Sequence, residues 1–373
     1  MITCVATYAQ AGEGHRRASE AVAASAQGDP GISVALRDCL DGSAAWFRWT
    51  YTRGYLLLVR RAPALWGGLY YAADAVGRQG WLRTLRRWGN ARQERGLTSW
   101  LLEHQPDVVI ATHFFPVEVV AALKRRGRLR SHLISAITDW LPHSFWICPG
   151  VDHYAVATEA TRQALRQRGV PDAQIAVTGI PIDQRFAAPL DRAATAQRLG
   201  LVADRFTILI ASGGFGLGPV EAIVRALAQA PGPYQLLVVA GRNAALQRTL
   251  EQLRPQIPHP TTVYGFVGNM EELMAVSDLL ISKSGGLTCA EAMARGLPMM
   301  IIDPIPGQEA RNCDILAGAG AAIRVAGAQD LVPQVERLRR PEVHAQFADA
   351  ARRLARPDAA AAVLRLAHTV AHA

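Results

Sequence analysis

Residues 281–312 read ISKSGGLTCAEAMARGLPMMIIDPIPGQEARN and predict a strand, a tight turn, a helix and a second strand in succession. The first strand ends just before the turn at 284–286, and the helix is expected over 287–294. Amide groups at the start of such a helix, together with the helix dipole, favour a bound phosphate. The second strand, 299–302, leads into a loop expected over 304–312. This order predicts a parallel α/β sheet with an anion site at its strand ends.

The polar side chains of this segment suit a sugar nucleotide. Ser284 or Thr288 can add a hydroxyl beside the phosphate, and Glu291, one turn into the helix, can accept hydrogen bonds from a ribose. In the following loop, Gln308 and Glu309 can bond sugar hydroxyls. An ordinary capped turn would explain the glycines alone equally well. The carboxylate and the amide at fixed spacing favour a binding site.

The rest of the chain repeats this alternation of short β-branched strands and helices, which is typical of parallel sheets wound with helices. The pattern pauses over 178–189, where Pro, Gly and polar residues indicate an interdomain linker. Each half opens with a strand and a Gly-rich turn, so we expect two Rossmann-like domains that face each other across a ligand-binding cleft. The expected segments are 1–180, 181–340 and a helical C-terminal region, 341–373.

The expected elements of the two halves are as follows. The first half has strands at 2–8, 33–37, 108–112, 133–138 and 153–157, with helices at 16–26, 116–126 and 159–168. The second half has strands at 206–211, 234–240, 262–264, 279–281 and 299–302, with helices at 219–230, 244–253, 270–276 and 287–294.

The charge of the chain is concentrated in an insert, 44–95. This stretch holds ten Arg against Asp74 and Glu94, a balance of +8 out of the formal +9 of all 373 residues, and five of the eight Trp. Over 81–94, apolar and basic residues separate onto opposite helical faces, which is typical of helices that lie on anionic membranes. The apolar face has Trp81, Leu85 and Trp88, and the polar face has Arg83, Arg86, Arg87 and Asn90. A core helix with an Arg-rich outer face is the alternative, and no nucleic-acid-binding motif is present.

The start of the chain and the cysteines bear on its compartment. Residues 1–8 predict a strand and lack the features of a secretory signal, and no apolar run reaches the roughly 18 residues of a membrane span. The five cysteines have no paired spacing, which favours a reducing compartment over a disulfide framework or a zinc site. We therefore expect a peripheral protein on the cytoplasmic face of a membrane.

The segment 282–312 carries the pattern SK-x-GG-x-T-x-x-EA…GLP…PIPGQE-x-x-N and resembles family 28 glycosyltransferases. The resemblance is strongest to the monogalactosyldiacylglycerol synthase and processive diacylglycerol glucosyltransferase branch. Matching pieces are collinear from residue 9 to about 312. They are Gly12-Glu13-Gly14-His15, Thr138-Asp139 with His143 and Trp146, 149–152 (PGVD), 179–182 (GIPI), Gly213-Gly214, Gly241-Arg242-Asn243 and Gly265-Phe266-Val267 with Met270.

The resemblance implies a GT-B fold, with the acceptor- and membrane-binding domain first and the UDP-sugar domain second. It implies that the peptide at 265–267 reads the uracil, that Glu291 holds the ribose, and that Gln308 and Glu309 hold the hexose. The full set of implied ligand residues is Gly14, Gly213, Gly214, Arg242, Gly265, Phe266, Val267, Ser284, Gly285, Gly286, Thr288, Glu291, Gln308 and Glu309. The sequence departs from the family in Glu13 and Phe215, either of which could alter the acceptor geometry.

His15 is the candidate general base, because proton removal from an acceptor hydroxyl needs a group that titrates near neutral pH. Asp139 follows a predicted strand and either orients the base or serves as the base itself. His143 suits acceptor-loop structure and catalysis equally. No Asp-x-Asp motif stands at a strand end, so we expect no obligatory metal or other cofactor, with the leaving-group charge stabilised by backbone amides. Lys283 could add positive charge near the diphosphate or lie on a solvated surface.

These observations predict inverting transfer of a hexose from UDP-glucose or UDP-galactose to diacylglycerol, which gives a β-glycolipid. Nothing in the sequence distinguishes the two hexoses. Another lipid acceptor, such as an undecaprenyl-linked intermediate, is the nearest alternative. A sugar-nucleotide epimerase shares the two-domain architecture but has no use for a membrane-facing insert. A nonenzymatic nucleotide-sugar sensor is disfavoured by the presence of His15 and Asp139.

Overall fold

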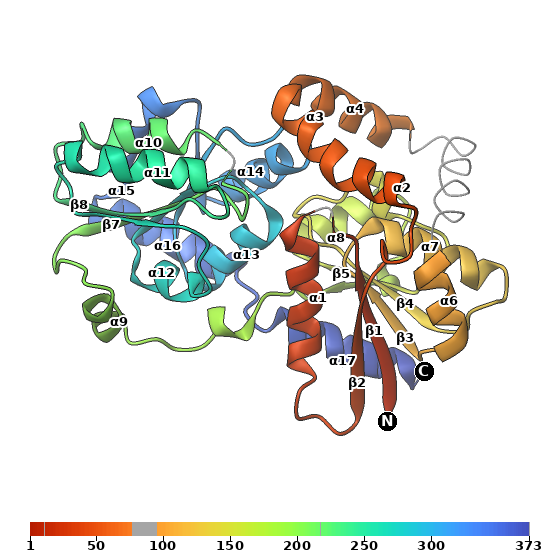
Figure 1. The fold of residues 1–373 in the computed structure, drawn as a ribbon. Coiled ribbons are helices and arrows are strands. Elements are labelled where there is room, and N and C mark those ends of the chain that lie inside the picture. Colours follow the sequence, from red (N-terminus) through yellow and green to blue (C-terminus); the bar gives the residue numbers. More distant parts are fainter. Residues whose placement is uncertain (11, 77–94, 217, 373) are drawn as a thin grey trace. The chain divides into compact units, whose positions relative to one another are not determined.

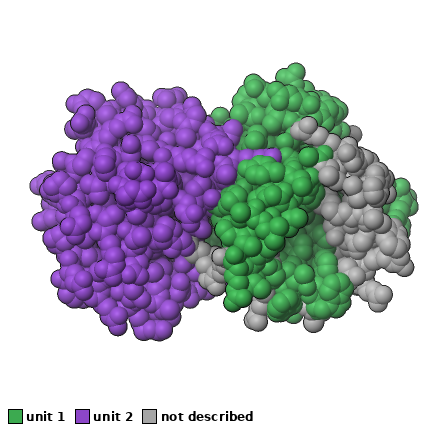
Figure 2. Space-filling view, turned by 90° about the horizontal axis from the view of Figure 1, so that it is seen from above, with its two compact units in different colours: residues 1–184, 305–308, 356–373 green, residues 185–304, 309–355 purple. Residues whose placement is uncertain are grey.

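A computed structural model describes residues 1–10, 12–76, 95–216 and 218–372 (Figure 1). The chain forms two compact units, each built around one parallel sheet (Figure 2). Unit 1 contains 1–184, 305–308 and 356–373, and unit 2 contains 185–304 and 309–355. The chain therefore leaves unit 1 after Gln184, contributes 305–308 to it, and returns to it at Arg356. Of the two C-terminal helices, α16 (Pro341–Leu354) belongs to unit 2 and α17 (Ala359–Ala371) belongs to unit 1.

The sheet of unit 1 has six parallel strands in the order β2-β1-β3-β4-β5-β6. Consecutive strands β1 and β2 pair directly, and the chain then crosses back over β1 to add β3 on its other side. The order of the strands therefore reverses between β1 and β3. The strands are β1 (Ile2–Tyr8), β2 (Ile32–Asp38), β3 (Val108–Ala111), β4 (His132–Ala136), β5 (His153–Val156) and β6 (Ile175–Val177).

Helices cover both faces of this sheet because its strands are apolar on both sides. On one face, α1 (Glu13–Ser25) contacts α17, and Val22, Val363 and Val370 share one apolar cluster with Ile110 of β3. On the other face lie α6 (Arg95–His104), α7 (Phe114–Arg125) and α8 (Glu159–Arg166), which bury a second apolar cluster. Helices of one unit that are distant in sequence thus share one core (Figure 1).

The described part of the insert between β2 and α6 consists mainly of helices. It comprises α2 (Ala45–Trp49), a π-helical turn over Thr50–Gly54, α3 (Tyr55–Arg61) and α4 (Pro63–Val76). The basic amphipathic helix expected over 81–94 lies outside the described residues. Within the described part of the chain, no helix has the length and apolar character that crossing a membrane requires.

The sheet of unit 2 also has six parallel strands, in the order β12-β11-β10-β7-β8-β9. Counted from its first strand, this is the Rossmann order, and it reverses between β7 and β10. The strands are β7 (Phe206–Ala211), β8 (Tyr234–Val239), β9 (Thr261–Tyr264), β10 (Leu279–Ser282), β11 (Met299–Ile302) and β12 (Ala322–Val325). The helices are α9 (Arg192–Arg198), α10 (Val220–Leu227), α11 (Ala244–Leu253), α12 (Met270–Val276), α13 (Gly286–Ala294), α14 (Gln308–Gly318), α15 (Leu331–Leu338) and α16.

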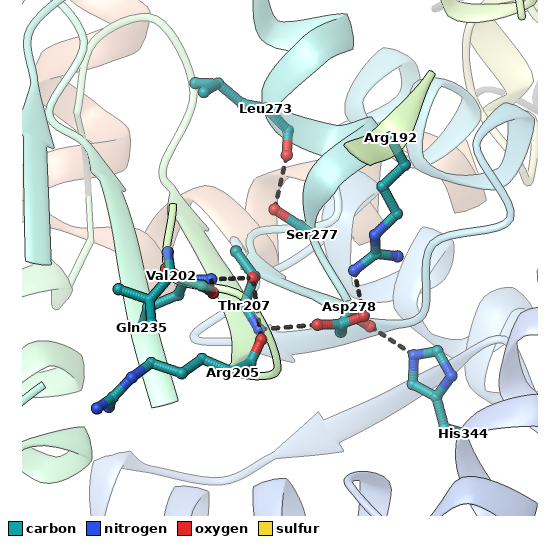
Figure 3. A network of polar contacts seen from close by, with 9 residues as sticks. All are labelled: Arg192, Val202, Arg205, Thr207, Gln235, Leu273, Ser277, Asp278 and His344. Atoms are coloured by element: carbon teal, nitrogen blue, oxygen red, sulfur yellow. Dashed lines mark hydrogen bonds and ion pairs between the residues drawn. The ribbon is translucent and has the colours of Figure 1, made fainter. Parts of the chain in front are cut away.

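A polar network centred on Asp278 joins several elements at the amino-terminal ends of the strands of this sheet (Figure 3). The Asp278 carboxylate accepts hydrogen bonds from the Thr207 amide at 2.8 Å and from the Arg192 guanidinium at 2.6 Å. Its carbonyl accepts from His344 Nε2 at 2.8 Å. One residue before β10 therefore connects β7, α9 and α16. The network lies at the opposite end of the strands from the loops that carry the ligand motifs.

The loop expected over 304–312 is wrong in its second half, because α14 begins at Gln308. Two prolines and Gly307, whose φ of +103° suits only glycine, confine the loop to the residues before it. The sequence that follows is rich in helix formers, and Glu309 in the first turn complements the helix dipole. Gln308 and Glu309 consequently stand at a helix start.

Candidate functional site

The residues of the first candidate cluster come from the segments that follow β1 and β3. In open parallel sheets, ligands bind beyond the carboxyl ends of the strands, at the point where strand order reverses. In unit 1 that point lies between β1 and β3. His15, in the first turn of α1 next to Gly14, follows β1, while Thr112 and His113 directly follow β3. The topology thus brings residues about a hundred positions apart to one place.

Hydrogen bonds fix which nitrogen of His15 carries the proton. Nδ1 lies 2.8 Å from the Thr112 carbonyl oxygen and 3.0 Å from Thr138 Oγ1. A carbonyl can only accept, so Nδ1 must be the donor, and Nε2 keeps its lone pair. Nε2 makes no hydrogen bond to any residue that the structure describes. Burial lowers the pKa of His15 to about 4, so the ring is neutral at physiological pH and able to accept a proton.

Aromatic rings surround His15. The His113 ring stands nearly perpendicular to it with centroids 4.5 Å apart, and the Trp146 ring is 6.4 Å away. His113 also caps α7, because its Nδ1 accepts a hydrogen bond from the Phe115 amide at 3.1 Å. Burial lowers the pKa of His113 well below its usual value. His113 and Thr112 were not predicted as site residues from the sequence. The position of His113, between a buried strand and the start of a helix, was the pattern that could have indicated it.

Asp139 is a buried carboxylate with partners other than His15. Its Oδ2 accepts a hydrogen bond from Trp146 Nε1 at 2.8 Å, and its Oδ1 accepts from the side-chain amide of Gln308, which clusters with unit 1. The hydrogen bonds of the His15 ring go to Thr112 and Thr138. Two neutral oxygens therefore orient the candidate base, and the carboxylate fixes Trp146 and Gln308.

His143 connects the insert to the sheet domain. Its Nδ1 accepts from the Phe145 amide at 3.1 Å, and its Nε2 donates to the Tyr70 carbonyl of α4 at 3.1 Å. Asp74 of the same helix accepts from the Ser144 amide at 2.7 Å. These contacts give His143 a structural role, as the anchor of α4.

The second candidate cluster lies at the carboxyl ends of β7, β8 and β9 in unit 2. Gly213 and Gly214 follow β7, and the Arg242 amide donates to the Gly214 carbonyl at 2.9 Å. Gly241, with φ of +61°, approaches so closely that a Cβ there would lie 2.7 Å from the Gly214 oxygen. The Arg242 guanidinium lies over the Phe266 ring, 4.5 Å from its centroid. Phe266, next to Gly265 and Val267, is nevertheless 47% exposed, so it offers an apolar face at the strand ends.

The turn after β10 opens α13 and carries the glycines of the expected phosphate site. Gly285 is the N-cap of α13 and makes no side-chain cap hydrogen bond, and the first turn of the helix, which begins at Gly286, presents backbone amides of the kind that bind anions at helix starts. Ser284 is fully buried, and its hydroxyl donates to the Glu309 carbonyl at 2.6 Å. Asn312 Nδ2 donates to the Ser284 carbonyl at 2.9 Å. Ser284 therefore fastens the turn to α14, while Thr288 and the buried Glu291 lie further along α13.

Comparison with known proteins finds relatives of both units. The family model of monogalactosyldiacylglycerol synthase matches residues 15–182, and that of the glycosyltransferase family 28 C-terminal domain matches 218–362. The processive diacylglycerol beta-glucosyltransferase of Bacillus pumilus is 32% identical over 274 residues, which cover 73% of this chain and 70% of that protein. The corresponding enzyme of Bacillus mycoides is 31% identical over 293 residues, 78% of this chain and 74% of that protein.

Solved structures with low sequence identity share the fold. MurG of Acinetobacter baumannii superposes with a TM-score of 0.65 at 16% identity, covering 99% of this chain and 100% of its own. HepE of Anabaena, solved with UDP and glucose, gives a TM-score of 0.57 at 17% identity with full coverage of both chains. The UDP-GlcNAc 2-epimerase of Neisseria meningitidis gives 0.62 at 15%, covering 98% of this chain and 99% of its own.

Two Rossmann-type sheets and these relatives define a GT-B glycosyltransferase. Within that class, the chain belongs to the monogalactosyldiacylglycerol synthase and processive diacylglycerol glucosyltransferase branch of family 28.

Proposed function

We propose that this enzyme transfers a hexose from UDP-glucose or UDP-galactose to the free hydroxyl of diacylglycerol, with inversion, at the cytoplasmic face of a membrane. The names of the relatives support diacylglycerol as the acceptor and favour glucose as the sugar. The loops of unit 2 support a nucleotide donor, because they combine an exposed aromatic face, glycine backbone and the start of helix α13.

One observation carries the lipid acceptor: a continuous series of aromatic rings leads from the exposed insert to the candidate base. Trp46 contacts Phe47 with ring centroids 5.8 Å apart, and Phe47 contacts Tyr51 at 5.9 Å. Tyr51 contacts His113 at 5.9 Å, and His113 contacts His15 at 4.5 Å. A lipid hydroxyl that approaches Nε2 of the base from the side of α2 would therefore meet this series of rings.

The described part of the insert also carries most of the exposed apolar side chains. Six of the ten large exposed hydrophobic side chains among the described residues lie between 46 and 71. They are Trp46 at 63%, Trp49 at 54%, Leu57, Leu65, Leu69 and Tyr71. Exposed Arg48 and Arg61 lie among them. Apolar and aromatic residues beside arginines suit the interface of an anionic bilayer.

The proposed reaction assigns one role to each cluster. The acceptor hydroxyl gives its proton to His15 Nε2, and its oxygen forms a bond to the anomeric carbon of the hexose. The bond from that carbon to the β-phosphate oxygen breaks, and UDP leaves with the electron pair. Attack from the side opposite the leaving group inverts the anomeric centre. The amides at the start of α13 stabilise the charge that UDP acquires.

UDP release by the purified protein tests the proposal. Vesicles that contain anionic lipid, with or without diacylglycerol, receive UDP-glucose and UDP-galactose in separate reactions. Release that requires diacylglycerol and one of the sugars is expected, together with a lipid product whose anomeric proton coupling is that of a β-glycoside. Release without diacylglycerol, or interconversion of sugar epimers without transfer, would contradict it.

Membrane binding has its own test. Replacing Trp46 and Trp49 with Ser should reduce flotation with anionic vesicles about tenfold or more, because two large apolar surfaces no longer enter the bilayer. Replacing the exposed Leu190 and Val202 of unit 2 with Ser is the matched control, which should leave flotation unchanged. Equal flotation of both double variants would exclude α2 as a membrane contact.

A further inference from the structure

Lys283 directly follows β10, at the point where the strand order of unit 2 reverses. The neighbours at this point are the loop after β7 and the turn that opens α13. We propose that the Lys283 ammonium binds the diphosphate of the sugar nucleotide and stabilises the negative charge that develops there as the hexose leaves. This role rests on the proposed function, in which UDP is the leaving group, and names the residue that stabilises it.

The path of the Lys283 side chain points to this site. A Cβ at Gly218 would lie 3.1 Å from Lys283 Cε and 2.8 Å from Ser212 Oγ. Gly218 has a φ of +133°, which only glycine adopts readily. The lysine stem therefore passes the glycine loop after β7, and its ammonium is held near the carboxyl ends of β7 and β10.

The ammonium has no protein counter-charge among the described residues. Lys283 is partly buried, yet no hydrogen bond or ion pair joins it to any residue that the structure describes. A partly desolvated cation is unfavourable unless an anion compensates for the lost water. The other lysine of the chain, Lys124, has such compensation, since it pairs with Asp152. At Lys283 the anion can come from a ligand.

The composition of the chain strengthens the assignment. Of its 40 basic residues, 38 are arginine and only Lys124 and Lys283 are lysine. Arginine carries a wide planar fork, whereas lysine delivers a compact point charge on a narrow stem with three rotating donors. A narrow stem fits beside Gly218, where even an added methyl group would collide. The use of lysine here therefore matches a confined phosphate site.

The charge balance of the reaction explains why a cation belongs at this position. When the bond between the anomeric carbon and the β-phosphate oxygen breaks, the electron pair stays on that oxygen and UDP gains one negative charge. The acceptor proton leaves through the base in the other unit. The ammonium keeps its proton throughout and interacts most strongly with the charge of the departing UDP.

Calorimetric binding of UDP and of uridine to the purified full-length protein tests the proposal. Lys283→Met should lower the affinity for UDP about 10- to 100-fold and leave the affinity for uridine unchanged, because uridine lacks the diphosphate. Lys283→Gln is a second variant with the same expectation. Arg340→Met is the matched control, since it removes one exposed positive charge at the start of α16. It should change neither affinity.

The outcomes separate the two proposals. Wild-type protein that binds UDP, together with Lys283 variants that bind it equally well, would overturn the role of Lys283 and leave the donor assignment intact. A parallel loss of uridine binding would also overturn it, because the residue would then act on the fold of the pocket. Wild-type protein that binds neither ligand would overturn the proposed donor and the Lys283 role with it.

Discussion

Lowering the pH tests how strongly His15 is desolvated. Burial lowers its pKa to about 4 from the ordinary value of 6.5. At pH 5.5, a ring with a pKa of about 4 is about 97% neutral, whereas one with an ordinary pKa is only about 9% neutral. Because only the neutral ring accepts a proton, kcat/KM should be nearly the same at pH 5.5 and pH 7.5. An ordinary histidine would lose about tenfold over that interval.

The assay is the pH dependence of kcat/KM, which reports the ionisation of the free enzyme. Diacylglycerol is supplied in nonionic micelles, so that surface charge stays constant from pH 4.5 to 8. His15→Gln should lose about 100-fold or more in kcat at every pH. His104→Gln, which changes an exposed histidine of α6, is the matched control and should leave the profile unchanged. The reasoning is refuted if kcat/KM of the wild type falls below about pH 6.5 and His15→Gln does not show this fall.

The same shift of pKa links stability to pH. The pKa of His15 is lower in the folded protein than in the unfolded chain, so the unfolded chain binds more protons between pH 4 and 6.5. The free energy of unfolding should therefore rise with pH across this window, by up to about 3 kcal/mol from this residue. The contribution is complete above pH 6.5 and is lost as the pH falls towards 4. Urea titrations of wild type and His15→Gln at several pH values check the sign. The prediction is contradicted if the free energy of unfolding of the wild type rises with pH no more steeply than that of the variant.

Two further pairs of substitutions, each a test variant with its control, probe the frame of unit 2. Gly241→Ala and Gly213→Ala both place a side chain at positive φ, which costs about 1–2 kcal/mol of stability in each case. Only the side chain at 241 also collides with backbone oxygens. Gly241→Ala should therefore destabilise the protein by at least about 2 kcal/mol more in urea and weaken UDP binding; equal losses would mean that the two loops are not in contact. Asp278→Asn should cost about 1–3 kcal/mol with UDP affinity unchanged, because the network lies at the other edge of the sheet. Asp314→Asn, in an exposed pair with Arg324, is its control at about 0.5 kcal/mol or less, and a similar loss in both would remove the special role of Asp278.

Most of the two sheets could be predicted from the sequence, because their inner strands are continuous apolar runs between glycine and proline turns. The strands β7 and β11 and the helices α11 and α12 have the expected bounds. The edge strands β6 and β12 were not predicted. They have three and four residues, and only part of each is buried, so their local pattern carries little signal.

The contacts around the candidate base could not be predicted, because they depend on the order of the strands. His15 depends on Thr112 only because β3 inserts beside β1, and no local pattern reveals that insertion. Ser284 shows the converse. In the sequence, its hydroxyl was expected beside a bound phosphate, but in the structure it donates to the carbonyl of Glu309. The local motif therefore predicted the turn itself and not the hydrogen bonds within it.

The return of α17 to unit 1 has a consequence for synthesis on the ribosome. Val363, Ala367 and Val370 cover the face of the sheet formed by strands near the beginning of the chain. The part of that face that α17 covers therefore stays exposed until the residues of α17 have left the exit tunnel, whereas the sheet of unit 2 is complete earlier. Unit 2 can thus fold while unit 1 still waits for its last helix, and nascent chains that end before α17 should be the ones that chaperones retain.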